Sequence, residues 1–336
     1  MRPEPTDFAP AADRDDRRDT RSRSAHRRPT RTQVAIVAWA ILVVVMVGIW
    51  GLPQGRPELF LLITTGLIAT SAGNPWAWAR VARDWAPLFV VLSTYDLLRS
   101  YADHWSRVHM FTQIHFDQWL FGGDVPTVRL QHLLYTPGTA HWWDYAAFTV
   151  YMSHFFAAFV VAALLWKFAY PQFRRFVGLF VGLTLLGFTT YALFPAAPPW
   201  LASEQGALPP TAKIIDEMWA HIGLRSGAQI FSATGHLANP VAAVPSIHAA
   251  YPLLIVLFFW RSAGRWRWLL PLYPLAMGLT LIYGAEHYVF DVLLGWLYAT
   301  VVYLLGTGLL DLWDRYREQK VATRLVPLMS ADIVQP

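Results

Sequence analysis

Two ionisable side chains stand four residues apart in the stretch YGAEHYVFDVLLGW, from Tyr283 to Trp296. They are His287 and Asp291, and a spacing of four residues places both on one face of a helix. An aspartate inside so apolar a run is costly to bury unpaired, so a ring nitrogen of His287 is its expected partner. Such a pair fixes the tautomer of the imidazole and raises its nucleophilicity. The alternative interpretation is a purely structural ion pair.

A second histidine lies in NPVAAVPSIHAAYPLL, from Asn239 to Leu254. Pro245 and Ser246 begin the apolar run, which makes Ser246 a natural N-cap and puts His248 in the first helical turn. The start of a helix binds anions, and a histidine there can give a proton to a leaving group. The alternative is that Pro-Ser merely caps the helix while His248 anchors it at an interface.

The elements that position these residues are predicted to lie in a membrane. Of the 336 residues 55% are hydrophobic and 15% are charged, and the mean hydropathy is +0.33. A soluble domain typically carries about 25% charged residues. The chain contains no cysteine, which excludes a disulfide scaffold. The predicted fold class is therefore all-α, a polytopic helical bundle in a membrane.

Long apolar runs predict about eight membrane spans. The runs cover residues 34–52, 57–72, 84–100, 142–166, 174–194, 246–260, 268–284 and 288–310. The predicted organisation is a disordered basic tail over 1–32, two additional spans over 33–83, a six-span core over 84–310 with outer segments 101–141 and 195–245, and a carboxyl-terminal tail over 311–336.

The basic residues test this arrangement, because Lys and Arg collect on the cytoplasmic side of a membrane protein. With the amino terminus inside, 21 of the 27 basic residues fall on inner segments and 6 on outer segments. The same arrangement puts nine of the 11 histidines on or near the outer face, His248 and His287 among them. The basic charge thus indicates orientation rather than a nucleic-acid partner. Both termini are expected in the cytoplasm, with the chemistry at the outer face of the plasma membrane.

The two histidine stretches together resemble a known family. The second and third motifs of the type 2 phosphatidic acid phosphatase superfamily of membrane enzymes are similar to PSIH and, about forty residues later, HYVFD. The longer stretches NPVAAVPSIHAA and EHYVFDVLLGW resemble its inositol-phosphorylceramide-synthase-like branch. The resemblance implies a six-helix phosphatase-like core in which His287 is the nucleophile that forms a phosphohistidine. It further implies that Asp291 orients His287, that His248 is the general acid and that Ser246 contacts a phosphate oxygen.

The sequence departs from the superfamily pattern in two places. Where the third motif usually has Ser-Arg ahead of its histidine, this chain has Thr280 and Leu281. The Lys and Arg of the first motif are missing from FPAAPPW, which follows the fifth predicted span. Lys167 and Arg174 have the right spacing, but they fall on the predicted inner face, so we exclude them.

A phosphate bound here still requires positive charge from other residues. Arg99, at the outer end of the third span, is the first candidate, and Arg129, in the first outer segment, is the second. Both have an alternative role as interface anchors, with Asp96 and Asp124 as their partners.

Several other polar residues are weaker candidates for the site: Lys213, Arg225, Asn239, His154 and Glu286. Of these, Asn239 is predicted to bind substrate, and Glu286 is placed to activate an acceptor hydroxyl unless it is simply exposed. His154 is an intramembrane histidine that a neighbouring group could equally satisfy. A metal site built from His104, His109 and His115 is set aside, because their spacing gives no helical pair and no cysteine assists.

These expectations describe a membrane enzyme that moves a phosphate or a phosphorylated headgroup, such as inositol phosphate, from a lipid to an alcohol or to water. The expected donor is a lipid phosphate or phospholipid at the outer leaflet, with no metal, no cofactor and no nucleic acid involved. One alternative is a plain lipid phosphate or polyprenyl pyrophosphate phosphatase. Another is a non-catalytic transporter or an envelope-assembly scaffold.

Overall fold

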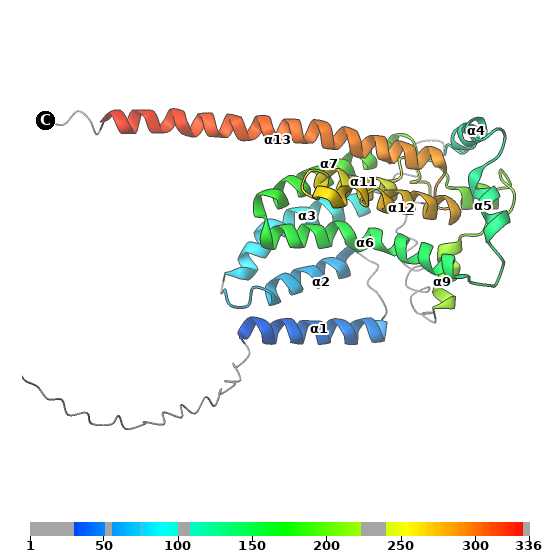
Figure 1. The fold of residues 1–336 in the computed structure, drawn as a ribbon, viewed down its shortest axis with the longest axis horizontal. Helices are drawn as coiled ribbons and strands as arrows, with labels where there is room; N and C mark the ends of the chain where they lie inside the picture. The colour runs from blue at the N-terminus through cyan, green and yellow to red at the C-terminus, as the bar shows by residue number, and fades with distance from the viewer. Residues whose placement is uncertain (1–29, 51–55, 75, 100–107, 223–239, 332–336) are drawn as a thin grey trace, which may run out of the picture.

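The chain forms a bundle of α-helices in a computed structural model that describes residues 30–50, 56–74, 76–99, 108–222 and 240–331. The long helices lie side by side, roughly parallel or antiparallel (Figure 1). Their bounds are α1 Arg31–Trp50, α2 Arg56–Ala69, α3 Ala77–Arg99, α6 Trp142–Phe168, α7 Tyr170–Leu193, α11 Ile247–Phe259, α12 Leu272–Tyr283 and α13 Val289–Ala331. The described residues form isolated β-bridges but no strand. The all-α prediction is confirmed.

Four of the described helices are long and apolar enough to cross a membrane. They are α1 over Arg31–Ile49, α6, α7, and α13 over Val289–Lys320, while α11 is apolar but shorter. Each of the eight predicted apolar runs overlaps one helix of the bundle. A helical membrane protein is therefore confirmed, whereas the number of spans stays a prediction.

The last helix, α13, is longer than the apolar run that predicted it. The run ends at residue 310, but the helix continues through DLWDRYREQK to Ala331, because most of these residues favour helix. Arg175 of α7 pairs with Asp311 and Asp314 of this extension at 2.6 and 2.8 Å. The carboxyl-terminal end of α13 projects beyond the other helices (Figure 1).

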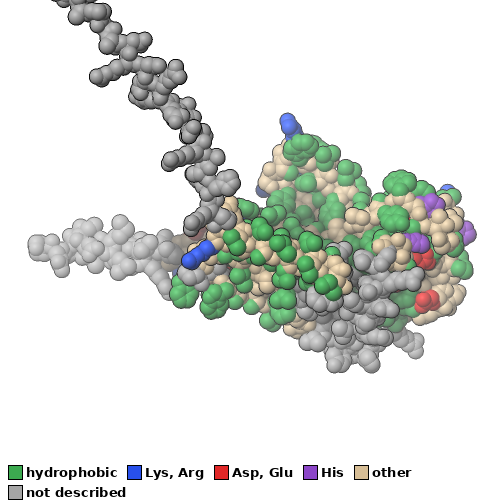
Figure 2. Space-filling view, turned by 90° about the horizontal axis from the view of Figure 1, so that it is seen from below, with side chains coloured by type: hydrophobic (Ala, Val, Ile, Leu, Met, Phe, Trp, Pro, Cys, Tyr) green, Lys and Arg blue, Asp and Glu red, His purple; other side chains and the backbone are tan. Residues whose placement is uncertain are grey.

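Short helices from the two predicted outer segments cover the other end of the bundle. They are α4 Phe111–Leu120, α5 Pro126–Leu134, α8 Pro199–Glu204 and α9 Ile214–His221. In Figure 1, α4, α5 and α9 lie opposite the projecting end of α13. Histidine and acidic side chains gather at this same end in Figure 2, while hydrophobic side chains cover much of the remaining described surface in that view.

Two groups of buried side chains hold the bundle together. The first joins α3, α7 and α11 and includes Trp85, Phe176 and Leu254. The second joins α6, α9 and α12 and includes Trp219 and Met277. Because lipid is as apolar as these side chains, close packing between helices supplies much of the attraction inside a membrane. Both groups include residues of α11, so this short helix is fixed from two sides.

Candidate active site

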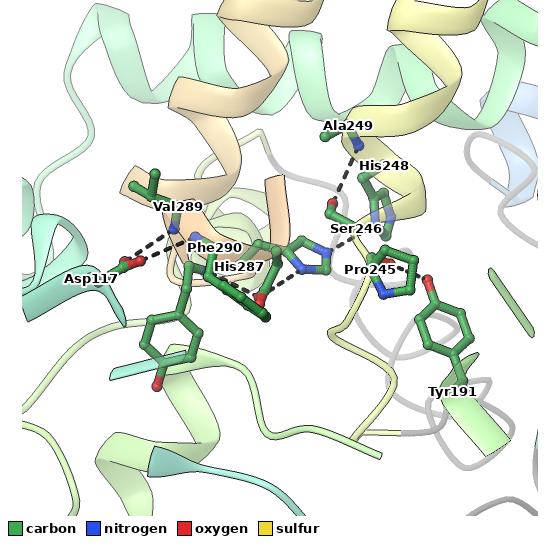
Figure 3. Close-up of polar contacts among 11 residues, drawn as sticks. Asp117, Tyr191, Pro245, Ser246, His248, Ala249, His287, Val289 and Phe290 are labelled. Atoms are coloured by element: carbon green, nitrogen blue, oxygen red, sulfur yellow. Dashed lines mark hydrogen bonds and ion pairs between the residues drawn. The ribbon is translucent and has the colours of Figure 1, made fainter. Parts of the chain in front are cut away.

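The starts of α11 and α13 meet at two histidines (Figure 3). His287 lies just before α13, with its Nδ1 3.3 Å from Oδ2 of Asp291 and its Nε2 3.4 Å from Nδ1 of His248. The His287 side chain is 5% exposed and that of Asp291 is fully buried, while His248 is partly exposed. Asp291 therefore contacts one ring nitrogen of His287, as their spacing predicted, and the other ring nitrogen faces His248.

A tight turn between α12 and α13 fixes the orientation of His287. The backbone amides of Glu286 and His287 both donate to the carbonyl oxygen of Leu281, at 3.0 and 3.2 Å. The amide of Tyr288 donates to Oδ2 of Asp291 at 3.0 Å. Leu281, which occupies the position of the superfamily's arginine, is fully buried. At this position the chain supplies a carbonyl that anchors the turn instead of a cation.

Ser246 caps α11, as its position before the helix predicted. Its Oγ accepts a hydrogen bond from the amide of Ala249 at 3.3 Å, and its own amide donates to the carbonyl of Asp291 at 3.0 Å. A Cβ added to Gly295 of α13 would collide with the carbonyl of Ser246. The backbones of α11 and α13 therefore touch beside the two histidines. The contact of Ser246 with a phosphate oxygen stays a prediction.

Asp117 of α4 supports the same site, and the sequence reasoning missed it. Its two carboxylate oxygens accept hydrogen bonds from the amides of Val289 and Phe290, each at 3.0 Å (Figure 3). Asp117 is fully buried, and this burial raises its pKa to about 6 against the opposing effect of the two hydrogen bonds. The available signal was a single aspartate among the aromatic residues of HFDQWL. Asp117 thus ties α4 to the first turn of α13.

A third histidine, His154 of α6, lies against His248. The two ring centroids are 4.1 Å apart, and His154 also stacks on Tyr251 at 5.2 Å. Tyr151, which lies on α6 like His154, also stacks on His248, with ring centroids 5.3 Å apart. These rings hold the imidazole of His248 in position beside His287.

The histidines that the sequence analysis set aside as metal ligands form no such cluster in the part of the chain that the structure describes. His109 stacks on Phe194 with ring centroids 3.8 Å apart, and His104 lies outside the described residues. No group of three His, Asp or Glu side chains within the described ranges is arranged to hold a metal ion.

The candidate cations occupy different places. Arg99 is the last residue of α3, but its side chain is not among those that the structure describes. Arg225 and the predicted substrate-binding residue Asn239 lie wholly outside the described residues. Arg129 contacts Asp124 at 3.3 Å, and its side chain is 70% exposed.

Lys213, which the sequence reasoning ranked lower, lies near the turn that carries His287. Its Nζ is 2.9 Å from Oδ2 of Asp216, and its charge lowers the pKa of Glu286. Lys213 is thus a described cation whose charge acts on the residue preceding His287.

Lys167, which has the spacing of the superfamily's first motif, lies near the carboxyl end of α6. Its Nζ donates to the carbonyl of Thr70 and to Oγ of Ser71 at 2.9 and 3.3 Å. The segment that stands where the first motif is expected holds Ala196 and Ala197, both fully buried. Their amides donate to the carbonyls of Val241 and His109. This segment therefore serves as a buried connector.

Comparisons with known proteins identify the family of the chain. The model of the PAP2 superfamily, the type 2 phosphatidic acid phosphatases, matches residues 114–305. The phosphoinositol dihydroceramide synthase of Bacteroides thetaiotaomicron is 29% identical over 313 residues, which cover 85% of this chain and 96% of that protein.

Two fungal proteins match a shorter part of the chain. The inositol phosphorylceramide synthase catalytic subunit of Schizosaccharomyces pombe is 27% identical over 46% of this chain and 38% of its own length. The inositol phosphorylceramide synthase of Candida albicans is 27% identical over 45% of this chain and 33% of its own length. No solved structure matches the chain. The chain belongs to the PAP2 superfamily, in its inositol-phosphorylceramide-synthase-like branch, and is a membrane lipid phosphotransferase or phosphatase.

Proposed function

We propose that the protein transfers the phosphoinositol headgroup of a membrane lipid to the hydroxyl of a second lipid, through a phosphohistidine at His287. The observation that carries this proposal is the position of His287 between Asp291 and His248. The three relatives, named as synthases of phosphoinositol-bearing sphingolipids, support the choice of headgroup.

The first step attaches the headgroup to the enzyme. Nδ1–H of His287 donates to Asp291, which keeps a lone pair on Nε2 for the attack on phosphorus. The bond between phosphorus and the oxygen of the lipid alcohol breaks, and protonated His248 gives its proton to that oxygen. The products are a diacylglycerol and a phosphorylated His287 that carries the inositol.

The second step releases the headgroup to the acceptor. His248, now neutral, takes the proton of the acceptor hydroxyl as the oxygen attacks phosphorus. The phosphorus–nitrogen bond breaks, and its electron pair returns to Nε2 of His287. Both histidines end in the protonation states in which they began, so the cycle needs no further acid, base or co-reactant.

The burial of the site favours a lipid alcohol over water as the acceptor. His287 is almost completely buried, and a site that excludes water protects a reactive intermediate from hydrolysis. The negative charge of the phosphate is neutralised by an outer cation, with Arg99 as the first candidate and Arg129 as the second.

We place the reaction in the outer leaflet of the plasma membrane, with both termini in the cytoplasm. The division of basic residues, 21 on inner and 6 on outer segments, supports this orientation. The core over 84–310 then carries the reaction, and the two helices before it are an addition.

A reconstituted assay tests the proposal. Purified protein receives phosphatidylinositol labelled in the inositol ring, together with ceramide or a polyprenol as acceptor. We expect label to move to a lipid alcohol and the His287→Ala variant to move none. Release of water-soluble inositol phosphate alone would favour a phosphatase. Hydrolysis of polyprenyl pyrophosphate without any headgroup transfer would replace the proposal with the pyrophosphatase alternative.

A further inference from the structure

Glu286 precedes His287 directly, yet the proposed reaction makes no use of it. Its Oε1 is buried and accepts no hydrogen bond from the described residues. A buried acceptor left without a partner costs about 1–3 kcal/mol, so natural proteins retain few of them and each calls for an explanation. The residue that carries this unpaired oxygen directly precedes the proposed nucleophile in the chain.

The backbone holds Glu286 in place at an energetic cost. Ala285 has a φ of 60°, in the left-handed region that a non-glycine residue adopts only at a cost of about 1–2 kcal/mol. Its carbonyl accepts a hydrogen bond from the amide of Trp200 at 3.2 Å, and the amide of Glu286 donates to Leu281. Strain of this kind persists where the surrounding structure imposes it, commonly at functional sites. The turn therefore fixes the backbone of Glu286 and of His287.

Besides His287, two charged side chains act on this carboxyl, and the ring of Trp200 lies beside one of them. Lys213 and Asp216 lie at the start of α9 and form an ion pair at 2.9 Å, and Nζ of Lys213 lies 5.1 Å from the ring centroid of Trp200. The charges of Lys213, Asp216 and His287 all act on Glu286. We call Glu286, Lys213, Asp216 and Trp200 the Glu286 cluster.

The charges of the Glu286 cluster indicate which ligand it suits. It holds two carboxyl groups against one ammonium, so it offers a phosphate no net positive charge. Carboxylate oxygens accept, and an ammonium donates, hydrogen bonds to hydroxyl groups. A neutral group that is rich in hydroxyls fits this combination better than an anion does.

We propose that the Glu286 cluster binds the hydroxyls of a polyol headgroup while the phosphate of that headgroup lies at His287. The inference rests on the proposed function, because it places the phosphate there. Oε1 of Glu286 accepts a hydrogen bond from one ring hydroxyl, and Lys213 donates one to another. Since Glu286 and His287 are consecutive, a headgroup with its phosphate at the imidazole brings its neighbouring hydroxyls to the carboxyl.

The protonation of Glu286 agrees with this role. Burial raises its pKa to about 7, although the charges of Lys213 and His287 lower it in part. Near neutral pH the carboxyl is therefore protonated in about half of the molecules. In that form it does not repel the adjacent phosphate, and it both donates and accepts hydrogen bonds.

A binding measurement tests the cluster separately from turnover. Full-length His287→Ala protein in phosphatidylcholine nanodiscs, which consumes no donor, is titrated with dioctanoyl phosphatidylinositol and with dioctanoyl phosphatidylmethanol. The two lipids carry the same phosphodiester charge, but phosphatidylmethanol has no headgroup hydroxyl. We expect phosphatidylinositol to bind at least about tenfold more tightly, because the site pairs its buried polar groups with hydroxyls.

Variants of Glu286 then identify the residue responsible. Glu286→Met, introduced into the His287→Ala protein, keeps the length of the side chain and removes the acceptor. It should abolish most of the preference for phosphatidylinositol over phosphatidylmethanol and leave phosphatidylmethanol binding unchanged. Glu286→Gln retains one acceptor oxygen and should restore part of the preference. Glu217→Gln is the matched control, since Glu217 lies on α9 but contacts the hydroxyl of Tyr135 at 2.7 Å. It should leave the preference intact.

Kinetics in the chain with His287 intact give the second measurement. Glu286→Met should raise the KM for phosphatidylinositol about tenfold or more and change kcat much less, as expected for lost ground-state binding. An equal preference for the two lipids in His287→Ala protein, or a preference that Glu286→Met leaves unchanged, overturns the inference. If the preference depends on Glu286 but no acceptor receives the headgroup, the polyol site stands and the proposed transfer fails. If the headgroup is transferred but the preference for phosphatidylinositol does not depend on Glu286, the inference about the Glu286 cluster fails and the proposed function stands.

Discussion

The two histidines of the site have different neighbouring side chains. Asp291 contacts Nδ1 of His287, whereas His248 lies against the rings of Tyr151 and His154. A carboxylate behind an imidazole fixes its tautomer and supports positive charge on it during attack. The geometry therefore assigns different roles to His287 and His248 in the proposed reaction.

Substitution of each histidine tests these roles. His287→Ala should abolish turnover and any phosphoenzyme, because the attacking nitrogen is gone. His248→Ala should spare a nitrophenyl phosphodiester, whose leaving group departs without a proton. Asp291→Asn should lower turnover by about a thousandfold or more, as in other carboxylate–histidine pairs. Thermal stability is measured alongside, because Asp291 is fully buried. Phosphate trapped on His248 rather than on His287 would reverse the assignment.

The packing of α11 against α13 sets the distance between the two histidines. His248 belongs to α11 and His287 precedes α13, so their separation depends on how closely these helices approach. Gly295 allows that approach, since any Cβ there would meet the carbonyl of Ser246. The close approach also lets the amide of Ser246 donate to the carbonyl of Asp291.

Gly295→Ala should separate the two helices and lower turnover. Overpacking of this kind costs about 1–3 kcal/mol of stability, and displacement of reacting groups by about 1 Å can cost a hundredfold in rate. Gly308→Ala, on the same helix with open space around it, should leave turnover and thermal stability near the starting values. Unchanged turnover in Gly295→Ala would show that the α11–α13 contact does not set the site.

The link between α4 and α13 predicts a dependence of stability on pH. Burial raises the pKa of Asp117 from 3.8 to about 6. Between these values the folded chain holds a proton that the unfolded chain has released. The free energy of unfolding should therefore fall as the pH rises from about 4 to about 6. Asp117→Asn does not titrate, so wild type should lose thermal stability relative to this variant over that interval.

An exposed aspartate provides the control for this experiment. Asp124 pairs with Arg129 at the surface, so Asp124→Asn should follow the wild-type profile. A difference between wild type and Asp117→Asn that stays constant from pH 4 to pH 7 would contradict a raised pKa for Asp117. Scan rates must be matched, because thermal unfolding of such a protein is commonly irreversible.

Helix spacing predicted the local part of the site, and tertiary contacts supplied the rest. The contact of His287 with Asp291 and the cap at Ser246 follow from separations of a few residues, so the sequence was sufficient for them. Asp117 lies 172 residues before Val289, and no periodicity links the two. The sequence likewise gave no reason to place Lys213 near Glu286, since both lie in irregular connections. The apolar runs predicted where helices occur, but a charged run such as DLWDRYREQK extends α13 without any hydropathy signal.

The candidate site and the projecting part of α13 lie at opposite ends of the molecule. The site and the short helices α4, α5 and α9 lie at one end, and α13 projects from the other (Figure 1). Helix α11 runs from Ile247, next to its cap Ser246 at the site, to Phe259, and the 3-10 helix Gly264–Trp268 follows it. Arg265 in that segment therefore lies at the opposite end of α11 from His248.

Cysteine labelling in intact cells tests which end faces outward. The chain has no native cysteine, so single cysteines in place of Gly123, Gly206 and Arg265 report their positions without interference. Gly123 and Gly206 lie in the turns after α4 and α8, where a Cβ meets no neighbour at either position. Both have a positive φ, so folding of each variant is checked first. An impermeant maleimide added outside should label positions 123 and 206 and spare 265 until the membrane is opened. Labelling of position 265 from outside would show that the orientation is inverted. The histidine site would then lie at the cytoplasmic leaflet and Lys167 at the outer face, and the exclusion of Lys167 and Arg174 on grounds of their predicted inner location would no longer hold.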